Sequence, residues 1–376
     1  MIISRRNNNI FAKWWWSVDK YMLSAFLLLI VLGVFLSFSA SPSISLIYNF
    51  EKYHYVIWHI LFAVTSLGII FMFSTMNLRI IRRTGVVFYV IAWALTVTTL
   101  LVDDGSHGAA RWVRIFGISL QPSEFMKPFF VITTAWFLDI YLRTKEKIWW
   151  IFVIVSLFAT IGILLKQPDF GMSVLITLVW CGQLILAGIP IWLLLLLGSI
   201  LGLIGVAAFF LFEHVHYRIV SMFASDGELG YQIKNSLKAF QNGGIFGKGA
   251  GEGIVRSHIP DAHTDFVFAV AGEEYGMFFC MFLIGIFAFI VIRGLLIAAK
   301  EHNTFLVLCL AGLICIFGLQ GIVNICSTLH LGPTKGMTLP FISYGGSSTW
   351  ASAIVAGIIL AVTRKNISAE DKDEYY

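Results

Sequence analysis

The stretch IPDAHTDFVFAVAGEEYGMFFCMFLIGIFAFIVI, residues 259–292, combines a membrane span with a cluster of charges. Its second half, residues 277–292, has no charged side chain and suits the hydrocarbon core of a bilayer. Its first half holds several ionisable side chains: Asp261, His263, Asp265, Glu273 and Glu274. Because such groups are costly in lipid, they usually mark a functional site when they occur in membrane helices.

The composition is that of an integral membrane protein. Of 376 residues, 58% are hydrophobic and 12% are charged, against about 25% charged in a soluble domain. The net charge of +5 is small, and basic residues gather at the ends of apolar runs, so we expect a membrane partner and no nucleic acid. The cysteines lie inside apolar runs without C-x-x-C spacing, which predicts buried free thiols: Cys181, Cys280, Cys309, Cys315 and Cys326.

Apolar runs long enough to cross a bilayer predict ten transmembrane helices. Eight are separate runs: 21–40, 54–74, 85–102, 122–142, 148–165, 265–292, 304–329 and 340–363. The uncharged stretch between Asp169 and Glu213 is too long for one span and predicts two, with a turn near Gly188-Ile189-Pro190. The predicted fold is therefore an all-α integral membrane protein.

The distribution of basic residues predicts that both termini are cytoplasmic. In that orientation the inner connections hold most of the Lys and Arg: Arg79, Arg82, Arg83, Arg143, Lys145, Lys147, Arg293, Lys300, Arg364, Lys365 and Lys372. The chain then divides into an N-terminal segment (1–20), a ten-helix domain (21–363) and a tail (364–376). A large outer loop, 213–264, joins helices seven and eight, and its part YQIKNSLKAF (231–240) predicts a short amphipathic helix on the membrane surface or packed over the bundle.

A glycine-rich stretch, GGIFGKGAGEG (243–253), lies in the same loop. It lacks the spacing of a phosphate-binding loop, so we interpret it as backbone that approaches a neighbour closely.

Two further motifs place charge at predicted outer helix ends. In QPSEFMK (121–127), Glu124 and Lys127 share one helix face, either as a buried ion pair or as the wall of a cavity. In KQPDFG (166–171), Asp169 is either a helix cap or a polar member of the same cavity.

The charges of the opening stretch divide into two groups. Thr264 is a candidate helix cap, which would place Asp265 in the first helical turn, where a carboxylate is favoured. Glu273 and Glu274 would lie about 12–14 Å deeper, at about 1.5 Å per residue. We expect at least one of these glutamates to be paired inside the bundle, and Glu273→Gln to harm folding more than chemistry.

The stretch GPTKGMTLPFISYGGSS (332–348) breaks helix repeatedly before the last predicted span. Irregular backbone at membrane depth is tolerated only where it is buried in protein or lines a cavity. Lys335 and Ser343 are its candidate ligands for an anionic headgroup. Several candidate residues map to the outer half of the bundle: Arg111, Arg114, Lys127, Asp169, Arg218, Asp265 and Lys335. Cations with a few carboxylates at this boundary suit an anionic lipid-linked substrate such as a polyprenyl pyrophosphate.

Together, HTDFVFAVAGEEYG, QPSEFMK, KQPDFG and GPTKGMTLPFISYGGSS resemble the SEDS family (shape, elongation, division and sporulation). The PTKG and DAHTDF variants are more similar to its division branch than to its elongation branch. The resemblance implies a ten-helix bacterial inner-membrane glycosyltransferase that polymerises lipid II at the periplasmic face, during septal wall synthesis. It places the essential aspartate on Asp265, the interior pair on Glu124 and Lys127, and further motif residues on Asp169 and Lys335.

The expected chemistry is attack of an acceptor hydroxyl on the donor sugar, with Asp265 as base. The departing pyrophosphate needs cations, for which Arg111, Arg114, Arg218 and Lys335 are candidates, or a divalent ion (Mg or Mn). His263 is a further candidate for substrate binding. The resemblance implies a class B penicillin-binding protein and other division proteins as partners. A lipid II flippase and a non-catalytic division scaffold are the alternative functions.

Overall fold

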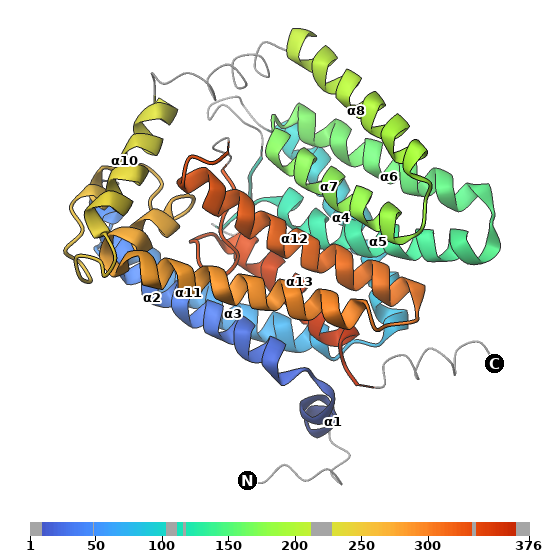
Figure 1. Cartoon of the computed structure of the whole chain (residues 1–376), viewed down its shortest axis with the longest axis horizontal. Helices are drawn as coiled ribbons and strands as arrows, with labels where there is room; N and C mark the ends of the chain where they lie inside the picture. Colours follow the sequence, from blue (N-terminus) through green and yellow to red (C-terminus); the bar gives the residue numbers. More distant parts are fainter. Residues whose placement is uncertain are drawn as a thin grey trace.

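The structure is a computed structural model of the chain, which describes residues 10–47, 49–102, 111–115, 118–211, 228–332 and 336–365 (Figure 1). Its α-helices are α1 (Ile10–Ser17), α2 (Lys20–Ile47), α3 (His54–Ser74), α4 (Leu78–Val102), α5 (Pro122–Thr144), α6 (Lys147–Lys166), α7 (Phe170–Leu186), α8 (Ile191–Leu211), α10 (Glu228–Gly243), α11 (Val267–Ala298), α12 (Thr304–Thr328) and α13 (Gly346–Val362). A 3-10 turn, η1 (Val255–His258), precedes α11.

Most of the predicted spans coincide with long apolar helices. Among the described residues, α2, α3, α4, α5, α6, α11 and α12 are long and apolar enough to cross a membrane, and α7 and α13 are shorter apolar helices. The uncharged stretch after Asp169 forms two helices, α7 and α8, as predicted, and Gly188 at the turn between them has a φ of 73°. The chain is therefore a multi-pass membrane protein built of helices.

One hairpin departs from the predicted all-α fold. Strand β1 (Val113–Ile115) pairs with β2 (Ile118–Leu120) in antiparallel register, with Val113 opposite Leu120. Three of the six strand residues, Val113, Ile115 and Ile118, are β-branched and favour extended backbone. The pairing of the two strands satisfies backbone groups in this short stretch before Pro122.

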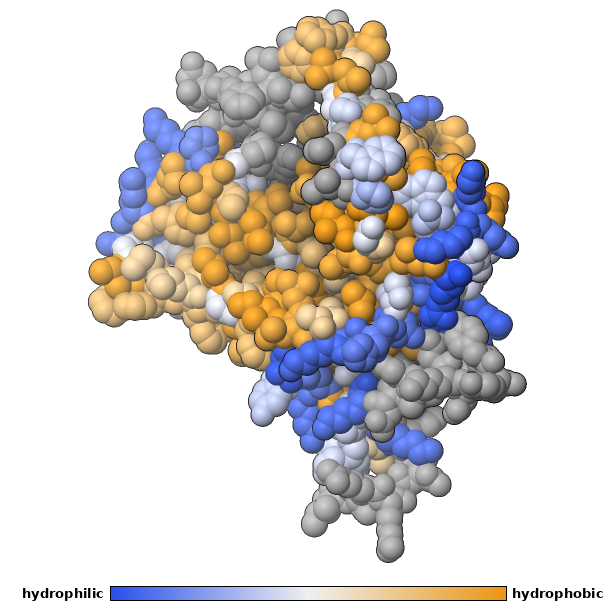
Figure 2. Space-filling view, turned by 45° about the vertical axis from the view of Figure 1, so that its right-hand side comes forward, coloured by the Kyte–Doolittle hydropathy of each residue, from blue (hydrophilic) through white to orange (hydrophobic). Residues whose placement is uncertain are grey.

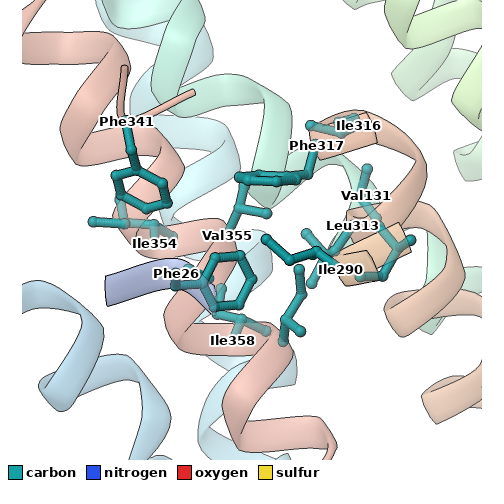
Figure 3. Packing of buried hydrophobic residues seen from close by; sticks show 14 of the residues in the cluster. Phe26, Val131, Ile290, Leu313, Ile316, Phe317, Phe341, Ile354, Val355 and Ile358 are labelled. Carbon is teal, nitrogen blue, oxygen red and sulfur yellow. The ribbon is translucent and has the colours of Figure 1, made fainter. Parts of the chain in front are cut away.

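The bundle is centred on α5, α12 and α13. The most apolar windows of α5 and α12 are 67% and 72% buried, against 28% for α4 at the periphery. Nearly every residue of α13 is buried. Figure 3 shows Phe26 of α2, Phe317 of α12 and Val355 of α13 meeting in this core. The rings of Phe26 and Phe317 pack edge to face with centroids 5.4 Å apart.

The surface of the bundle exposes many large apolar side chains. Figure 2 shows a broad hydrophobic surface with hydrophilic residues gathered at its margins. Large side chains such as Leu101, Phe210 and Phe278 are exposed by 79%, 78% and 58%. In water such a surface would promote aggregation, so this surface is suited to lipid.

One end of the bundle is basic, since it holds Arg79, Arg143 and Arg364. At the basic end, the Arg293 guanidinium of α11 donates to the Asp19 carboxylate, with Nη2 and Oδ2 2.6 Å apart. Successive helices cross the bundle in alternating directions. The opposite end therefore holds the starts of α3, α5, α7, α11 and α13 (Figure 1). The predicted site residues Glu124, Asp169 and Asp265 all belong to this second end.

Helix α11 is longer than one span requires. Its 32 residues measure about 48 Å at about 1.5 Å per residue, against about 30 Å of hydrocarbon. It breaks at Gly276, where φ is 78° and ψ is −175°. Residues 277–298 alone cover about 33 Å and suffice to cross. The first part of α11, with Glu273 and Glu274, therefore has room to lie toward the outer boundary.

Candidate active site at the outer end of the bundle

Asp265 lies in a tight turn immediately before α11. The backbone N–H groups of Thr264, Asp265 and Phe266 donate to the Asp261 carbonyl, at N···O distances of 3.0, 3.1 and 3.3 Å. The helix begins at Val267 with Phe266 as its N-cap, and the Thr264 hydroxyl donates to the Asp261 carbonyl instead of capping. The prediction that Thr264 caps the helix with Asp265 in its first turn was wrong, because the turn at Asp261 already uses these groups.

Asn324 of α12 joins the Asp265 turn to the irregular segment before α13. Its side-chain amide donates to the carbonyls of Asp265 and Met337, at 2.8 and 2.7 Å. A Cβ on Gly336 would lie 3.0 Å from Oδ2 of Asp265, so a larger residue at 336 would crowd the carboxyl group. Within the described residues, the Asp265 carboxylate forms no ion pair and accepts no hydrogen bond.

The surroundings of Asp265 bring its pKa close to neutral. Burial raises the pKa from 3.8 to about 7, and the carboxylates of Asp261 and Glu124 also raise it, whereas the Arg111 guanidinium lowers it. A carboxyl group with a pKa near the working pH can accept a proton and release it again. Asp265 is therefore suited to act as a general base.

Glu124 and Lys127 form the predicted ion pair. Lys127 Nζ donates to Glu124 Oε2 at 2.7 Å and to Gln320 Oε1 at 2.8 Å, and both charged side chains are buried. The Gln320 amide in turn donates to the Thr338 carbonyl at 3.0 Å. This chain of polar groups connects α5, α12 and the segment before α13, so the pair fixes the helices around Asp265.

Asp169 caps α7, one of the two alternatives that the sequence left open. Its carboxylate accepts from the Met172 N–H at 3.2 Å. Arg111 holds the adjoining turn, because its guanidinium donates to the carbonyls of Gln167 and Pro168 at 3.0 and 2.6 Å. The β-hairpin is thereby attached to the end of α6, within electrostatic range of Asp265.

His263 and Ser343 face the protein interior. The His263 ring lies between Tyr55 and Tyr344, with centroids 4.7 and 5.3 Å away, and burial lowers its pKa to about 4. A neutral imidazole supplies no positive charge to a pyrophosphate. The Ser343 hydroxyl is buried and accepts from the Leu339 N–H at 2.8 Å, closing the local turn. Their roles as substrate ligands stay predictions.

Three predicted cations have no described side chain. Arg218 and Lys335 lie outside the described residues, and Arg114 contributes only its backbone, paired with Ser119 in the hairpin. Among the residues that the structure describes, no group of three or more His, Cys, Asp or Glu side chains could hold a metal ion. The carboxylates that act electrostatically on Asp265 are those of Asp261 and Glu124, and Glu124 is already paired with Lys127.

Sequence reasoning missed Gln320 and Asn324, which connect the site to α12. They are four residues apart and so share one face of the helix, in a run that is otherwise apolar. Paired amides on one face of a membrane helix are a readable signal for a polar contact. Arg256 was also missed. Only the folded loop brings it to its partners, the Glu274 carboxylate and the Ser39 carbonyl.

Comparisons with known proteins agree with this arrangement. The FtsW/RodA/SpoVE family, described as cell cycle proteins, matches residues 19–368. A probable peptidoglycan glycosyltransferase FtsW of Caulobacter vibrioides is 38% identical over 97% of this chain and 94% of its own length. The corresponding protein of Coxiella burnetii is 33% identical over 92% of this chain and 96% of its own length.

Solved structures share the fold. A chain from a study of how a peptidoglycan synthase complex coordinates polymerization and crosslinking has a TM-score of 0.77 at 23% identity, over 92% of this chain and 97% of that one. The rod shape determining protein RodA of Thermus thermophilus has a TM-score of 0.67 at 23% identity, over 93% of this chain and 97% of that one.

Proposed function

Because the chain belongs to the FtsW/RodA/SpoVE family of cell cycle proteins, we propose that it is a peptidoglycan glycosyltransferase that polymerises lipid II during cell division. The observation that carries this proposal is the Asp265 carboxyl group. Contacts to the Asp265 backbone hold the residue in place. Its carboxylate has no hydrogen-bond partner among the described residues, and its pKa is about 7.

The proposed reaction transfers one sugar chain to another. The 4-hydroxyl of the acceptor N-acetylglucosamine attacks C1 of the donor N-acetylmuramic acid, while Asp265 takes the hydroxyl proton. The bond from C1 to the polyprenyl pyrophosphate breaks, and the pyrophosphate leaves with the bonding electrons. Single displacement inverts the anomeric centre, so an α-linked donor gives a β-linked glycan.

Cations at the outer end would stabilise the departing pyrophosphate. Arg111 has the best support, because it lies within electrostatic range of Asp265 and its side chain is half-buried. Arg114, Arg218 and Lys335 are candidates by their positions in the sequence. Lys127 is committed to Glu124 and Gln320, so we assign it to the wall of the site. A divalent cation, Mg or Mn, would supply the same charge stabilisation when bound.

The membrane arrangement follows from the same proposal. We place ten spans at α2 to α8 and α11 to α13, both termini in the cytoplasm, and the segment 213–264 in the periplasm. The protein would act in the inner membrane at the division septum, with a class B penicillin-binding protein and other division proteins. The end of the bundle with Arg79, Arg143 and Arg364 supports this orientation, since positive charge favours the cytoplasmic side.

The flippase alternative has less support than the polymerase. Its candidates for a translocation path were Glu124, Lys127, Glu273 and Glu274, which form polar contacts that hold the fold together. All four have partners within the protein.

Incubation of the purified protein with lipid II, with and without its transpeptidase partner, tests the proposal. We expect glycan chains from the wild-type protein and none from Asp265→Asn. Scrambling of lipid II without polymer, unaffected by Asp265→Asn, would identify a flippase instead. A scaffold would support division in cells that carry Asp265→Asn.

A further inference from the structure

The break in α11 exposes backbone groups that a membrane protein must satisfy. At Gly276 the helical hydrogen bonds are interrupted, and unpaired N–H and C=O groups are costly where water is scarce. The glycine-rich loop supplies the missing partners. The N–H groups of Lys248 and Gly249 donate to the carbonyls of Glu273 and Glu274, at 3.0 and 2.9 Å.

The pairing continues on the other side of the break. The N–H groups of Met277 and Phe278 donate to the carbonyls of Gly244 and Ile245, at 3.0 and 3.4 Å. The two backbones touch, since a Cβ on Gly247, where φ is 84°, would lie 2.2 Å from the Glu274 carbonyl oxygen. The predicted close approach of this stretch is confirmed, and it explains the glycine requirement.

Both glutamates of α11 are bound to the segment that follows the glycine-rich loop. The Glu273 carboxylate accepts from the backbone N–H groups of Val255 and Arg256, at 2.9 and 2.8 Å, and from the Asn242 amide at 2.7 Å. The Arg256 guanidinium forms an ion pair with Glu274 and donates to the Ser39 carbonyl of α2. Both glutamates are almost fully buried.

These contacts join the two ends of the segment that contains Asp265. Val255 and Arg256 at its start bind Glu273 and Glu274 at its end, and Asp265 lies near its middle. We propose that Glu273 and the Arg256–Glu274 pair are positioning residues, which hold Asp265 in place by joining the two ends of this segment. The inference rests on the proposed function, because Asp265 is assigned there as the base.

The arrangement leaves little freedom to the intervening residues. Ile259 and Ala262 are buried, and the Tyr344 N–H donates to the His263 carbonyl at 2.9 Å. Asn324 fixes the Asp265 carbonyl from α12. With the two ends of the segment joined, Asp265 has a fixed place relative to α12. If the contacts of Arg256 and Glu273 were lost, only the contacts to α12 and to the segment before α13 would hold Asp265.

The chain offers a matched control for the Arg256–Glu274 pair. Arg293 forms a second, more exposed ion pair with Asp19 at the basic end of the bundle, away from Asp265. We therefore compare Arg256→Met with Arg293→Met, each measured as lipid II polymerisation per folded molecule. Arg256→Met should lower kcat about 10-fold or more with KM changed less than about 3-fold, since Asp265 is misplaced while the substrate contacts remain. Arg293→Met should change neither value more than about 2-fold.

Conservative replacement separates positioning from packing. Arg256→Lys retains the charge opposite Glu274 and should recover part of the lost kcat, whereas Arg256→Met should not. Equal kcat per folded molecule in Arg256→Met and wild type would overturn the inference, whatever the change in stability.

A second measurement does not depend on activity. In Asp265→Cys protein, labelling of residue 265 by a membrane-impermeant maleimide is followed by mass spectrometry. We expect the labelling rate to change at least about 3-fold when Arg256→Met is added and to stay the same when Arg293→Met is added. Equal rates in both backgrounds would overturn the positioning role. Absence of polymer from the wild-type protein would overturn the proposed function alone.

Discussion

Two carboxylates eight positions apart, Asp265 and Glu273, have opposite surroundings. Glu273 accepts three hydrogen bonds, two of them from backbone N–H groups, and is fully buried. Asp265 is half-buried, and among the described residues its carboxylate has no hydrogen-bond partner. Glu273 is thus bound as part of the fold, whereas our proposal has the carboxylate of Asp265 meet the substrate.

The comparison shows how a membrane protein can keep a carboxylate that has no hydrogen-bond partner among the described residues. Burial and like charges raise the pKa of Asp265, which disfavours the ionised form in the resting protein. The surrounding contacts act on the Asp265 backbone, through Asn324 and the Asp261 turn. Position is therefore fixed without using the carboxylate oxygens.

Asp265→Asn should have the largest effect. Removal of a general base costs about 10²–10⁴-fold in rate, so polymer should fall below detection. The folded yield and Tm should stay close to wild type, because the carboxylate has no partner to lose among the described residues. Polymerisation assays with gel filtration check both statements, and a misfolded Asp265→Asn protein would remove the distinction from Glu273.

Stability against pH gives an independent check on Asp265. Its folded pKa of about 7 lies above the ordinary value of 3.8, so the folded state binds the proton more tightly. This contribution to stability is fully present below about pH 4 and is lost as the pH rises through 7. The stability of Asp265→Asn should therefore fall less than that of wild type between pH 5 and 8, measured as Tm in detergent.

Glu273→Gln should chiefly reduce folding. The amide keeps one acceptor and loses the charge, which weakens hydrogen bonds worth about 1.5–3 kcal/mol each. We expect a lower folded yield, with polymerisation per folded molecule reduced less than in Asp265→Asn. Normal expression with complete loss of polymer would contradict the division between the two carboxylates.

Lys127→Met tests whether a third carboxylate, Glu124, behaves like Glu273. Removing one member of a buried pair typically costs about 3–5 kcal/mol, because the remaining charge is left without its partner. Thermal unfolding should show this loss, and Glu124→Gln combined with Lys127→Met should recover part of it. Equal stability of the single and double variants would mean that the pair is not coupled.

The smallest predicted effect concerns Asp261. Its carboxylate raises the pKa of Asp265, so Asp261→Asn should lower that pKa. The acid limb of the rate profile should then move to lower pH by less than about one unit. A shift to higher pH would show that Asp261 acts on the site in another way.

The sequence predicted most helices because a long apolar run in lipid must satisfy its own backbone hydrogen bonds, which a helix does. It also indicated the Glu124–Lys127 pair, since their spacing puts them on one helix face. It could not predict the start of α11, because the turn at Asp261 competes with the Thr264 cap. Nor could it predict that Arg256 meets Glu274, since this contact depends on how the glycine-rich loop enters the break.

The most direct test measures Asp265→Asn and Glu273→Gln side by side, as lipid II polymerised per folded molecule at pH 7.5. We expect a folded Asp265→Asn protein that makes no polymer, and a less stable Glu273→Gln protein whose folded fraction still polymerises. Polymer from folded Asp265→Asn would contradict the assignment of Asp265 as the base.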